Sequence, residues 1–338
     1  MSFAAMMEPL LVGQALTYNQ ARALMQFLTG GEAVDAQVAA VCTALRIKGA
    51  TATELAAFAS VMREQCVGQE HSLVDLVDTC GTGGGTPSFN ISTAASFVAA
   101  GAGVKIAKHG NRAVTSTCGS ADVLESLGAK IQTEWDVLIE MLETVGIGFL
   151  FAQSYHPTMK NVNPARRALG FRTFLNQMGP LLNPTGAKRQ LVGVYDPSLA
   201  FAMAEAFMKL GSERVLIAHG DDGLDEVSPV GPTRYALLWD GELSEGILTP
   251  QGFGLQPVEE SAVLPSDTLE GNTALLREAV SNADSDRCRA VLPSAACAIW
   301  IAGLAPDRKA AATLAHESVR SGAATEKLEA FVRASHGV

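Results

Sequence analysis

The sequence predicts an α/β fold in which a small all-helical domain is joined to a larger α/β domain with a mostly parallel central sheet. The first 72 residues repeat apolar side chains at helical spacing, whereas short strand-like runs alternate with helical patterns from residue 73 onward. Such alternation is typical of a parallel sheet. The composition agrees, since 32 glycines and only 6% aromatic residues fit an α/β fold with many tight loops better than a β-sandwich.

Three helices are expected in the first part of the chain. A capping box of Thr17 with Gln20 begins one helix, which ends at Gly30. A second capping box, Thr51 with Glu54, begins another. The helix between them has its apolar residues on one face: Val38, Val41, Cys42 and Leu45. Three helices in succession indicate a small helical unit.

Short apolar runs predict five strands in the second part: 73–77, 104–107, 147–152, 191–195 and 214–218. Helices are expected between and after them: from about 92, from a cap at Ser120 to Gly128, at 135–145 and 198–210, and around 275, 295–301 and 309–319. Residues 161–186 are rich in Pro, Asn, Gly and Arg and are expected to lead away from the sheet. We therefore expect a helical domain at 1–72, joined by an excursion near 165–187, and an α/β domain at 73–164 and 188–338.

Charge and cysteine usage exclude several classes of protein. The net charge of −10 argues against nucleic-acid or anionic-membrane partners, because those need clustered Lys and Arg. The six cysteines form no CxxC pair, which disfavours a zinc ribbon or a thioredoxin-like site and fits reduced thiols. Residues 1–11 lack the basic start of a signal peptide, and the apolar segment 294–305 is too short to span a bilayer. A cytoplasmic location is expected.

A glycine-rich run, Asp78–Gly85, lies between a predicted strand and a predicted helix. Glycines let backbone N–H groups turn toward an anion, and the start of the helix adds partial positive charge. The spacing is neither that of a Walker loop nor the full GxGxxG fingerprint, and a flexible turn is the alternative. Asn90, Ser92 and Thr93 follow; these residues either cap the helix or hold phosphate oxygens and a metal-bound phosphate.

A basic cluster and an acidic cluster each follow a later strand. Lys108–Arg112 (KHGNR) suits an anionic substrate at the carboxyl end of a strand, with a solvated turn as the alternative. Asp221–Glu226 carries carboxylates that suit Mg²⁺ bridging to phosphate, or again form a solvated turn. Together, these motifs describe a pocket for Mg²⁺-complexed pyrophosphate. The hydrolase motifs GxSxG and HExxH do not occur in the sequence.

Several runs occur in the order seen in anthranilate phosphoribosyltransferases, and the sequence resembles that family over nearly its whole length. The runs are Gly81–Gly84, Phe89–Thr93, Ala107–Arg112, Gly119–Glu125, Arg166–Arg172, Gly179–Pro184 and Gly223–Glu226. The KHGNR run with the downstream Asp-Glu pair is highly specific, whereas the glycine loop is shared with nucleoside phosphorylases of the same fold. The resemblance implies a nucleoside phosphorylase/phosphoribosyltransferase-like fold, a homodimer formed through the helical domain, and Mg²⁺ at two ions per subunit.

The resemblance also implies an activity and a set of site residues. The activity is transfer of 5-phosphoribose from phosphoribosyl pyrophosphate to the amine of anthranilate, releasing pyrophosphate, in tryptophan biosynthesis. The implied catalytic residues are Lys108, Asp225 and Glu226. Phosphoribosyl pyrophosphate would be held by Gly81, Thr82, Gly83, Gly84, Asn90, Ser92, Thr93, Lys108 and Ser120. Anthranilate would face Gly81, His109, Asn111, His156, Arg166 and Gly179, and the metal would be held by Ser92, Asp225 and Glu226.

Elementary chemistry agrees with this assignment. Cleavage at the anomeric carbon builds negative charge on the leaving diphosphate, which Mg²⁺, Lys108 and loop N–H groups would stabilise. The carboxylate of the acceptor needs a cation, and Arg166 can supply a planar fork for it. The acceptor's amine is weakly basic, so we do not assign His109 as a general base.

The sequence departs from the family's usual pattern at two places. Gly85 replaces the usual Asp after the Gly-Thr-Gly-Gly run, in a loop one residue shorter before Phe89, so a carboxylate contact near the ribose or metal is not expected at this position. Residues 292–295 read Leu-Pro-Ser-Ala in place of a usual Leu-Asn-Ala pattern, which is expected to alter packing more than chemistry.

Two rival functions remain open from the residues. A pyrimidine-nucleoside phosphorylase-like enzyme would carry a Lys-Ser phosphate motif early in the glycine loop, and no such motif precedes Asn90. A non-catalytic nucleic-acid-binding relative on the same scaffold would show a basic groove with stacking aromatics. The net charge of −10, with three Trp and four Tyr, disfavours the second rival.

Overall fold

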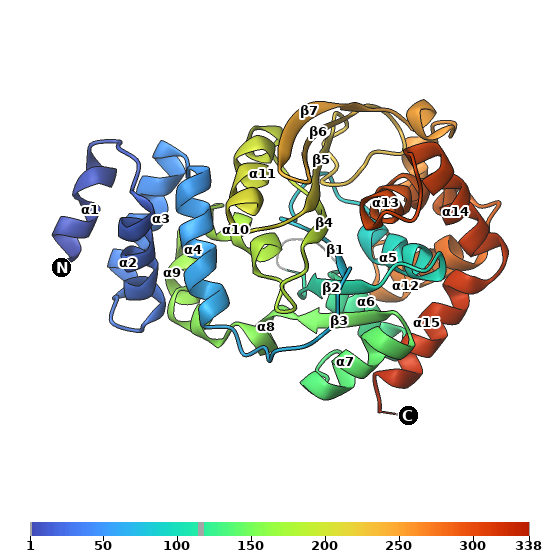
Figure 1. The fold of residues 1–338 in the computed structure, drawn as a ribbon, viewed down its shortest axis with the longest axis horizontal. Helices are drawn as coiled ribbons and strands as arrows, with labels where there is room; N and C mark the ends of the chain where they lie inside the picture. Colours follow the sequence, from blue (N-terminus) through green and yellow to red (C-terminus); the bar gives the residue numbers. More distant parts are fainter. Residues whose placement is uncertain (1, 114–117, 338) are drawn as a thin grey trace.

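A helical bundle lies beside an α/β domain in the computed structural model, which describes residues 2–113 and 118–337 (Figure 1). The bundle consists of α1 (Phe3–Leu11), α2 (Tyr18–Thr29), α3 (Asp35–Lys48) and α4 (Ala52–Glu64). Both predicted capping boxes are confirmed, at Thr17 before α2 and at Thr51 before α4. Helix α1 was not predicted, because nearly all of its residues are apolar or small and show no separate buried face in the sequence.

Seven strands form one sheet in the order β3-β2-β1-β4-β5-β6-β7. The strands are β1 (Val77–Gly81), β2 (Ile106–Gly110), β3 (Ile147–Phe151), β4 (Arg189–Gly193), β5 (Arg214–Gly220), β6 (Thr233–Trp239) and β7 (Glu242–Leu248). The first five pair in parallel, whereas β6 and β7 form an antiparallel hairpin at one edge. The mostly parallel sheet was predicted; the hairpin was not.

The predicted bounds of three strands were wrong. The segments 73–77, 104–107 and 191–195 correspond to strands at 77–81, 106–110 and 189–193. The cause is visible in β1, where Asp78 and Thr79 are polar yet lie within the sheet. The Thr79 hydroxyl is 2.6 Å from that of Ser96, and Asp78 accepts the His109 N–H at 2.9 Å. Because tertiary partners satisfy these side chains, polarity did not mark the end of the strand.

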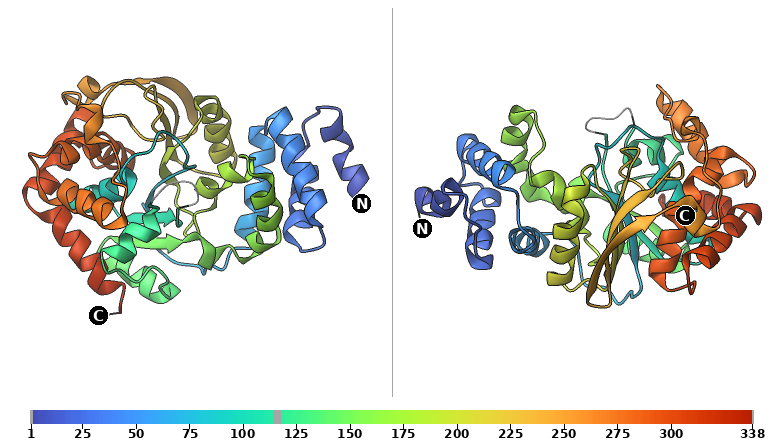
Figure 2. Two further views of the ribbon diagram at one scale, coloured as in Figure 1. Left: turned by 180° about the vertical axis from the view of Figure 1, so that it is seen from behind. Right: turned by 90° about the horizontal axis from the view of Figure 1, so that it is seen from above.

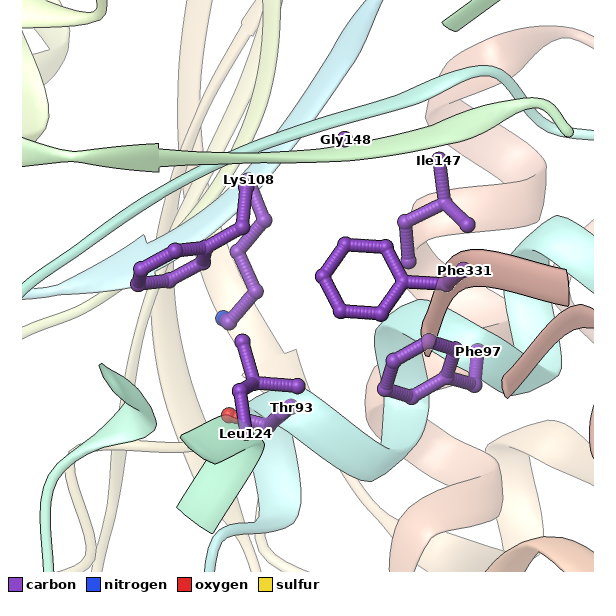
Figure 3. Close-up of a pocket in the computed structure, with 8 residues that line it drawn as sticks. Thr93, Phe97, Lys108, Leu124, Ile147, Gly148 and Phe331 are labelled. Carbon is purple, nitrogen blue, oxygen red and sulfur yellow. The ribbon is translucent and has the colours of Figure 1, made fainter. Parts of the chain in front are cut away.

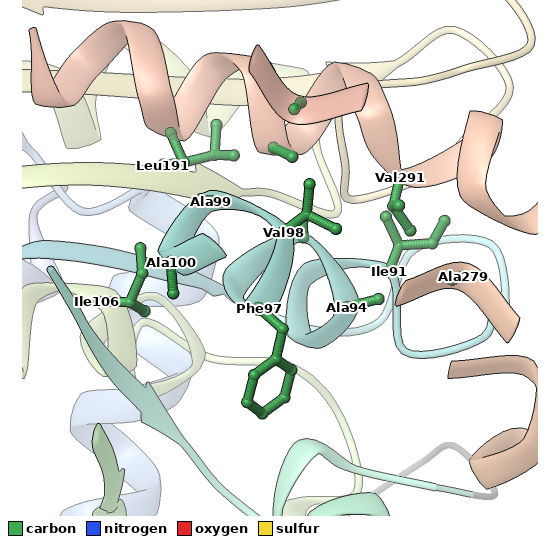
Figure 4. Close-up of a cluster of buried hydrophobic side chains, with 14 of the residues drawn as sticks. Ile91, Ala94, Phe97, Val98, Ala99, Ala100, Ile106, Leu191, Ala279 and Val291 are labelled. Atoms are coloured by element: carbon green, nitrogen blue, oxygen red, sulfur yellow. The ribbon is translucent and has the colours of Figure 1, made fainter. Parts of the chain in front are cut away.

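Two apolar cores cover the two faces of the sheet. Leu191 and Leu216 face a core built with α5 (Ile91–Gly101) and α13 (Asp286–Ala302), shown around α5 in Figure 4. Their neighbours Val192 and Ile217 face the opposite core, which the strands share with the helical bundle and α11 (Ala200–Lys209). This alternation is the period-two pattern of strands buried on both sides.

The remaining helices complete the α/β domain. They are α6 (Ser120–Ser126), α7 (Trp135–Thr144), α8 (Ala152–Tyr155), α12 (Leu269–Ser281), α14 (Arg308–Arg320) and α15 (Ala323–Ala334). Figure 2 shows the C-terminal helices on the side of the sheet away from the bundle. The predicted cap at Ser120 was wrong: Ser120 is the first residue of α6, Gly119 is the cap, and the helix ends at Ser126 before Gly128. Helix α15 was not predicted.

The segment between β3 and β4 returns to the bundle. It contains α9 (Asn163–Leu169), α10 (Leu175–Met178) and a 3₁₀ turn at Gly179–Leu182. Val162 and Ala165 share a core with α3, and Leu181 shares it with α4. We therefore propose to keep the division into a helical domain at 1–72 with an excursion near 165–187, and an α/β domain formed by the rest. No helix among the described residues is long and apolar enough to cross a membrane.

Candidate active site

The glycine loop begins where β1 ends, at Gly81. Gly83 and Gly84 have φ of 66° and 93°, a backbone conformation that favours glycine. The loop is tied to the acidic loop after β5, because Thr86 donates its N–H to Gly223 O at 2.8 Å and its hydroxyl to Asp222 O at 3.0 Å. The two motifs, well separated in sequence, therefore meet at the carboxyl end of the sheet.

Lys108 lies on β2 with its side chain almost fully buried. Its amine donates to Thr79 O at 2.5 Å and lies 3.4 Å from the Ser92 hydroxyl. Figure 3 shows this amine pointing toward the start of α5, where Thr93 lies. Burial lowers the pKa of Lys108, and the nearby Asp78 and Glu226 carboxylates oppose that shift. A single cation thus stands at the helix start, which is already suited to an anion.

Glu226 reaches the start of α5 from the acidic loop. Its Oε1 accepts the Ser92 N–H at 3.0 Å, and its Oε2 accepts the Ser294 hydroxyl at 3.3 Å. Burial, followed by the neighbouring Asp225 carboxylate, raises the pKa of Glu226 to about 7. Burial also raises the pKa of Asp225. Asp225 and Glu226 are both half-buried, and two adjacent carboxylates repel one another unless a cation lies between them.

Both departures from the family pattern touch this acidic pair. A β-carbon at Gly85 would lie 2.6 Å from Asp225 N and 2.7 Å from Asp225 Oδ1. The loop therefore takes the space that a larger side chain at position 85 would need. Residues 292–295, expected to alter packing more than chemistry, include Ser294, whose hydroxyl donates to Glu226.

The residues that suit a metal ion are oxygen donors. The Asp225 and Glu226 carboxylates and the Ser92 hydroxyl are hard ligands of the kind that Mg²⁺ prefers. No cluster of three or more His, Cys, Asp or Glu is present in residues 2–113 and 118–337. A Mg²⁺ ion that bridges to substrate phosphates needs only one or two carboxylates from the protein, so the residues present fit that ion.

His109 and His156, both predicted to face the acceptor, are buried next to one another. Their rings lie 5.4 Å apart, edge to face. His109 Nδ1 is 3.1 Å from Gly179 O, and His156 Nε2 is 2.9 Å from Leu182 O. A carbonyl only accepts, so these two ring nitrogens carry the hydrogens. His109 Nε2 and His156 Nδ1 are then bare acceptors, and neither has a partner among the described residues.

Both imidazoles are neutral at ordinary pH. Burial, followed by the charge on His156, lowers the pKa of His109 to about 3. Burial lowers the pKa of His156 to about 4. An imidazole with so low a pKa is a weak base.

Other predicted site residues lie at the rim. Ser120 donates its hydroxyl to Asn111 O at 3.2 Å, and Asn111 Oδ1 accepts the Gln153 amide at 3.1 Å. Asn90 donates its amide to Cys118 O at 3.2 Å. The Thr82 N–H donates to Gly193 O at 2.8 Å. The glycines that follow Thr82 are therefore the ones that can offer their N–H groups to an anion.

Arg166 is not brought into contact with the other predicted residues. It lies on α9, and burial lowers the pKa of its guanidinium. Its guanidinium makes no ion pair or hydrogen bond within the part of the chain that the structure describes. The N–H donors of that group are therefore available to a carboxylate.

Sequence reasoning gave no site role to Asp78 and Gln190, and left Arg172 open between drawing anthranilate toward the site and solvating its loop. Arg172 donates to Gly84 O at 2.6 Å and lies over the Tyr195 ring at 4.3 Å, joining the excursion to the glycine loop. Asp78 and Gln190 lie on neighbouring strands beneath the site, 3.2 Å apart between Oδ2 and Nε2. Their polarity inside apolar strand patterns was the available signal.

The comparisons with known proteins agree with this geometry. Residues 5–66 match the model described as the glycosyl transferase family, helical bundle domain, and residues 73–325 match the model of that family's a/b domain. The chain therefore belongs to the glycosyl transferase family that joins these two domains.

The similar proteins define the family further. The chain is 45% identical to an anthranilate phosphoribosyltransferase of Moorella thermoacetica, covering 97% of each chain. The crystal structure of the Thermus thermophilus anthranilate phosphoribosyltransferase matches with a TM-score of 0.92 and 37% identity, over 98% of this chain and 99% of that one. Within the glycosyl transferase family, the chain belongs to the anthranilate phosphoribosyltransferases.

Relatives in complex with ligands are also similar. The Saccharomyces cerevisiae enzyme in complex with PRPP and Mg matches with a TM-score of 0.88 and 27% identity, over 99% of this chain and 98% of that one. The same yeast enzyme in complex with 4-fluoroanthranilate matches with a TM-score of 0.86 and 26% identity, over 100% and 99% of the two chains. Neither rival function, nucleoside phosphorolysis or nucleic-acid binding, is supported by these matches.

Proposed function

We propose that this protein transfers 5-phosphoribose from phosphoribosyl pyrophosphate to the amine of anthranilate and releases pyrophosphate, a step of tryptophan biosynthesis. The observation that carries the proposal is the meeting of Lys108, Ser92 and Glu226 at the start of α5, below the glycine loop. This arrangement offers a cation, a helix start and an acidic metal ligand to one diphosphate.

The donor half of the site stabilises the leaving group. Lys108, the N–H groups of Gly83 and Gly84 and the start of α5 would face the diphosphate oxygens as negative charge develops on them. Gly81, Thr82, Asn90, Thr93 and Ser120 complete the proposed donor-binding set. A preorganised donor of this kind is worth about 2.7–4 kcal/mol of barrier.

Mg²⁺, bound by Asp225, Glu226 and Ser92 and proposed at two ions per subunit, would neutralise the diphosphate. Partial burial of both carboxylates favours an ion there, because an unpaired charge away from water is costly. The roles of Lys108, Asp225 and Glu226 as the catalytic set are part of this proposal.

The acceptor half of the site is proposed to hold anthranilate between two kinds of group. Arg166 would pair with its carboxylate, and Asn111, Gly81 and Gly179 would line the ring. The bare acceptors His109 Nε2 and His156 Nδ1 suit the N–H groups of an aromatic amine. The main contribution of these residues is then to orient the amine toward the anomeric carbon, rather than to remove a proton from it.

We also propose a homodimer formed through the helical domain, in the cytoplasm. The bundle exposes the apolar side chains of Leu11, Val12, Val34 and Ile47, at 68%, 61%, 60% and 82%. Exposed apolar side chains on one domain favour a protein interface there. Light scattering of the wild type and of Ile47→Lys tests this: a dimer that becomes a monomer supports the proposal, and a monomeric wild type refutes it.

One assay tests the activity. The protein is mixed with Mg²⁺, phosphoribosyl pyrophosphate and anthranilate, and loss of anthranilate fluorescence is followed together with pyrophosphate release. Equal amounts of anthranilate consumed and pyrophosphate formed are expected. A folded protein that consumes no anthranilate under these conditions would refute the proposed function.

A further inference from the structure

The carbonyl groups of the 3₁₀ turn Gly179–Leu182 are each held by a side chain from a different part of the fold. A turn this short leaves its carbonyls without regular helical partners. The four contacts are His109 Nδ1 with Gly179 O at 3.1 Å, Gln190 Nε2 with Pro180 O at 2.9 Å, Arg63 Nε with Leu181 O at 2.7 Å, and His156 Nε2 with Leu182 O at 2.9 Å.

Gln190 links this turn to the floor of the site. It lies on β4 with no exposed surface, and its Nε2 is also 3.2 Å from Asp78 Oδ2 on β1. The other oxygen of that carboxylate, Asp78 Oδ1, accepts the His109 N–H at 2.9 Å on β2. Gln190 is therefore connected to Pro180 directly and to His109 through Asp78, so one buried amide ties both residues of the acceptor half together.

The orientation of the amide shows which contacts are favoured. Both close neighbours of Nε2 are oxygen acceptors, so the NH₂ group faces them and uses both of its hydrogens. Gln190 Oε1 is buried and has no partner in residues 2–113 and 118–337. An unpaired buried acceptor destabilises the fold. Gln190 thus directs its donor group at the turn and at Asp78, with Cys80 Sγ a more distant neighbour at 4.0 Å, and leaves its acceptor unpaired.

We propose that Gln190 is a positioning residue for the anthranilate half of the site. Through Pro180 and Asp78 it holds the turn and β2 so that His109 Nδ1 and Gly179 O stay in contact, and it touches neither substrate. The inference rests on the proposed function, because it concerns the acceptor of that reaction. It predicts that loss of the amide affects anthranilate and leaves phosphoribosyl pyrophosphate unaffected, since Lys108, Ser92 and Glu226 do not contact Gln190.

The test compares Gln190→Met with wild type. Methionine keeps the length of the side chain and removes both donated hydrogen bonds. The KM for anthranilate is expected to rise roughly tenfold or more, because small displacements of a positioned group cost large factors in rate or binding. The KM for phosphoribosyl pyrophosphate is expected to stay within roughly twofold.

Asn272→Leu is the matched control. Asn272 is a buried amide that donates to Ser266 O and Thr268 O, both at 2.8 Å, on the far side of the α/β domain. Its loss is expected to lower the melting temperature and to leave the KM for anthranilate unchanged. A purely structural role of Gln190 would give the same result in both variants.

Arg63→Met provides a second route to the same turn. Arg63 reaches Leu181 O from the end of α4, so its loss loosens the turn without disturbing β4. The KM for anthranilate, and not that for phosphoribosyl pyrophosphate, is expected to rise in Arg63→Met as well. If Gln190→Met does not fold, Arg63→Met tests the proposal by itself. An active wild type whose variants change both KM values equally would overturn the role of Gln190, whereas an inactive wild type would instead refute the proposed function.

Discussion

Gly85 lies directly against Asp225. A β-carbon built at Gly85 would approach Asp225 N to 2.6 Å and the carbonyl of Gly223 to 2.7 Å. The shortened glycine loop thus occupies the space beside the proposed metal ligand, and the atoms in contact there include backbone that cannot rotate away.

Gly85→Asp is expected to displace one of the two loops. Overpacking of this kind costs about 1–3 kcal/mol, and here the strain falls on Asp225. We expect a loss of kcat of roughly tenfold or more together with a higher Mg²⁺ requirement, as measured by titrating Mg²⁺ in the fluorescence assay. Gly231→Ala is the control, because a β-carbon at that position meets nothing within 4 Å. Equal Mg²⁺ requirements in the wild type and Gly85→Asp would contradict this account.

Arg166→Ala is expected to raise the KM for anthranilate far more than the KM for phosphoribosyl pyrophosphate. The physical reason is the loss of the only proposed cation for the acceptor's carboxylate. Steady-state kinetics with each substrate varied in turn measure the split. Arg167→Ala is the matched control, since Arg167 stands next to it on α9 with an exposed side chain. An equal effect of Arg166→Ala on both KM values would remove Arg166 from the acceptor site.

The double variant Asp225→Asn/Glu226→Gln is expected to lose turnover, and EDTA is expected to have the same effect on the wild type. The metal-free variant should melt no lower than the metal-free wild type, because it removes two half-buried carboxylates, of which Asp225 makes ionised Glu226 less favourable. Asp221→Asn, a change in the exposed part of the same loop, is expected to keep activity. Full activity of the double variant would refute the metal assignment.

The protein is expected to lose stability as the pH falls from about 6.5 toward 4. His109 and His156 have pKa values of about 3 and about 4 when folded and about 6.5 when unfolded. Between pH 6.5 and 4 the unfolded chain therefore binds more protons than the folded chain does. Burial of the two neutral histidines does not oppose folding above pH 6.5, and it opposes folding increasingly as the pH falls below that value. Each contributes a slope of about 1.4 kcal/mol per pH unit.

Urea unfolding at several pH values measures this slope. In His156→Asn, the dependence of the unfolding free energy on pH is expected to be weaker than in the wild type by the contribution of one histidine, about 1.4 kcal/mol per pH unit. This difference is expected down to about pH 4. The same slope in both proteins would show that His156 is not buried in its neutral form.

Local signals in the sequence were sufficient for much of the fold. The capping boxes at Thr17 and Thr51 act within four residues, so helices α2 and α4 could be predicted without tertiary contacts. The motifs that meet at the site, including Lys108 and the Asp225–Glu226 pair, were also recognisable, because their residue types suit few other purposes in that order. The β6–β7 hairpin was missed, since Glu242–Leu248 is largely exposed and carries no apolar alternation.

The chain by itself determined the succession of helices and strands and the kind of chemistry, since both depend on residue types close together in sequence. Tertiary structure alone decided that Asp78 belongs inside a strand, that Glu226 caps the start of α5, and that Gln190 reaches Pro180. These contacts join segments that only the sheet order brings together, and a buried polar group is tolerated only where a distant partner satisfies it. The pattern of such partners cannot be read from any one segment.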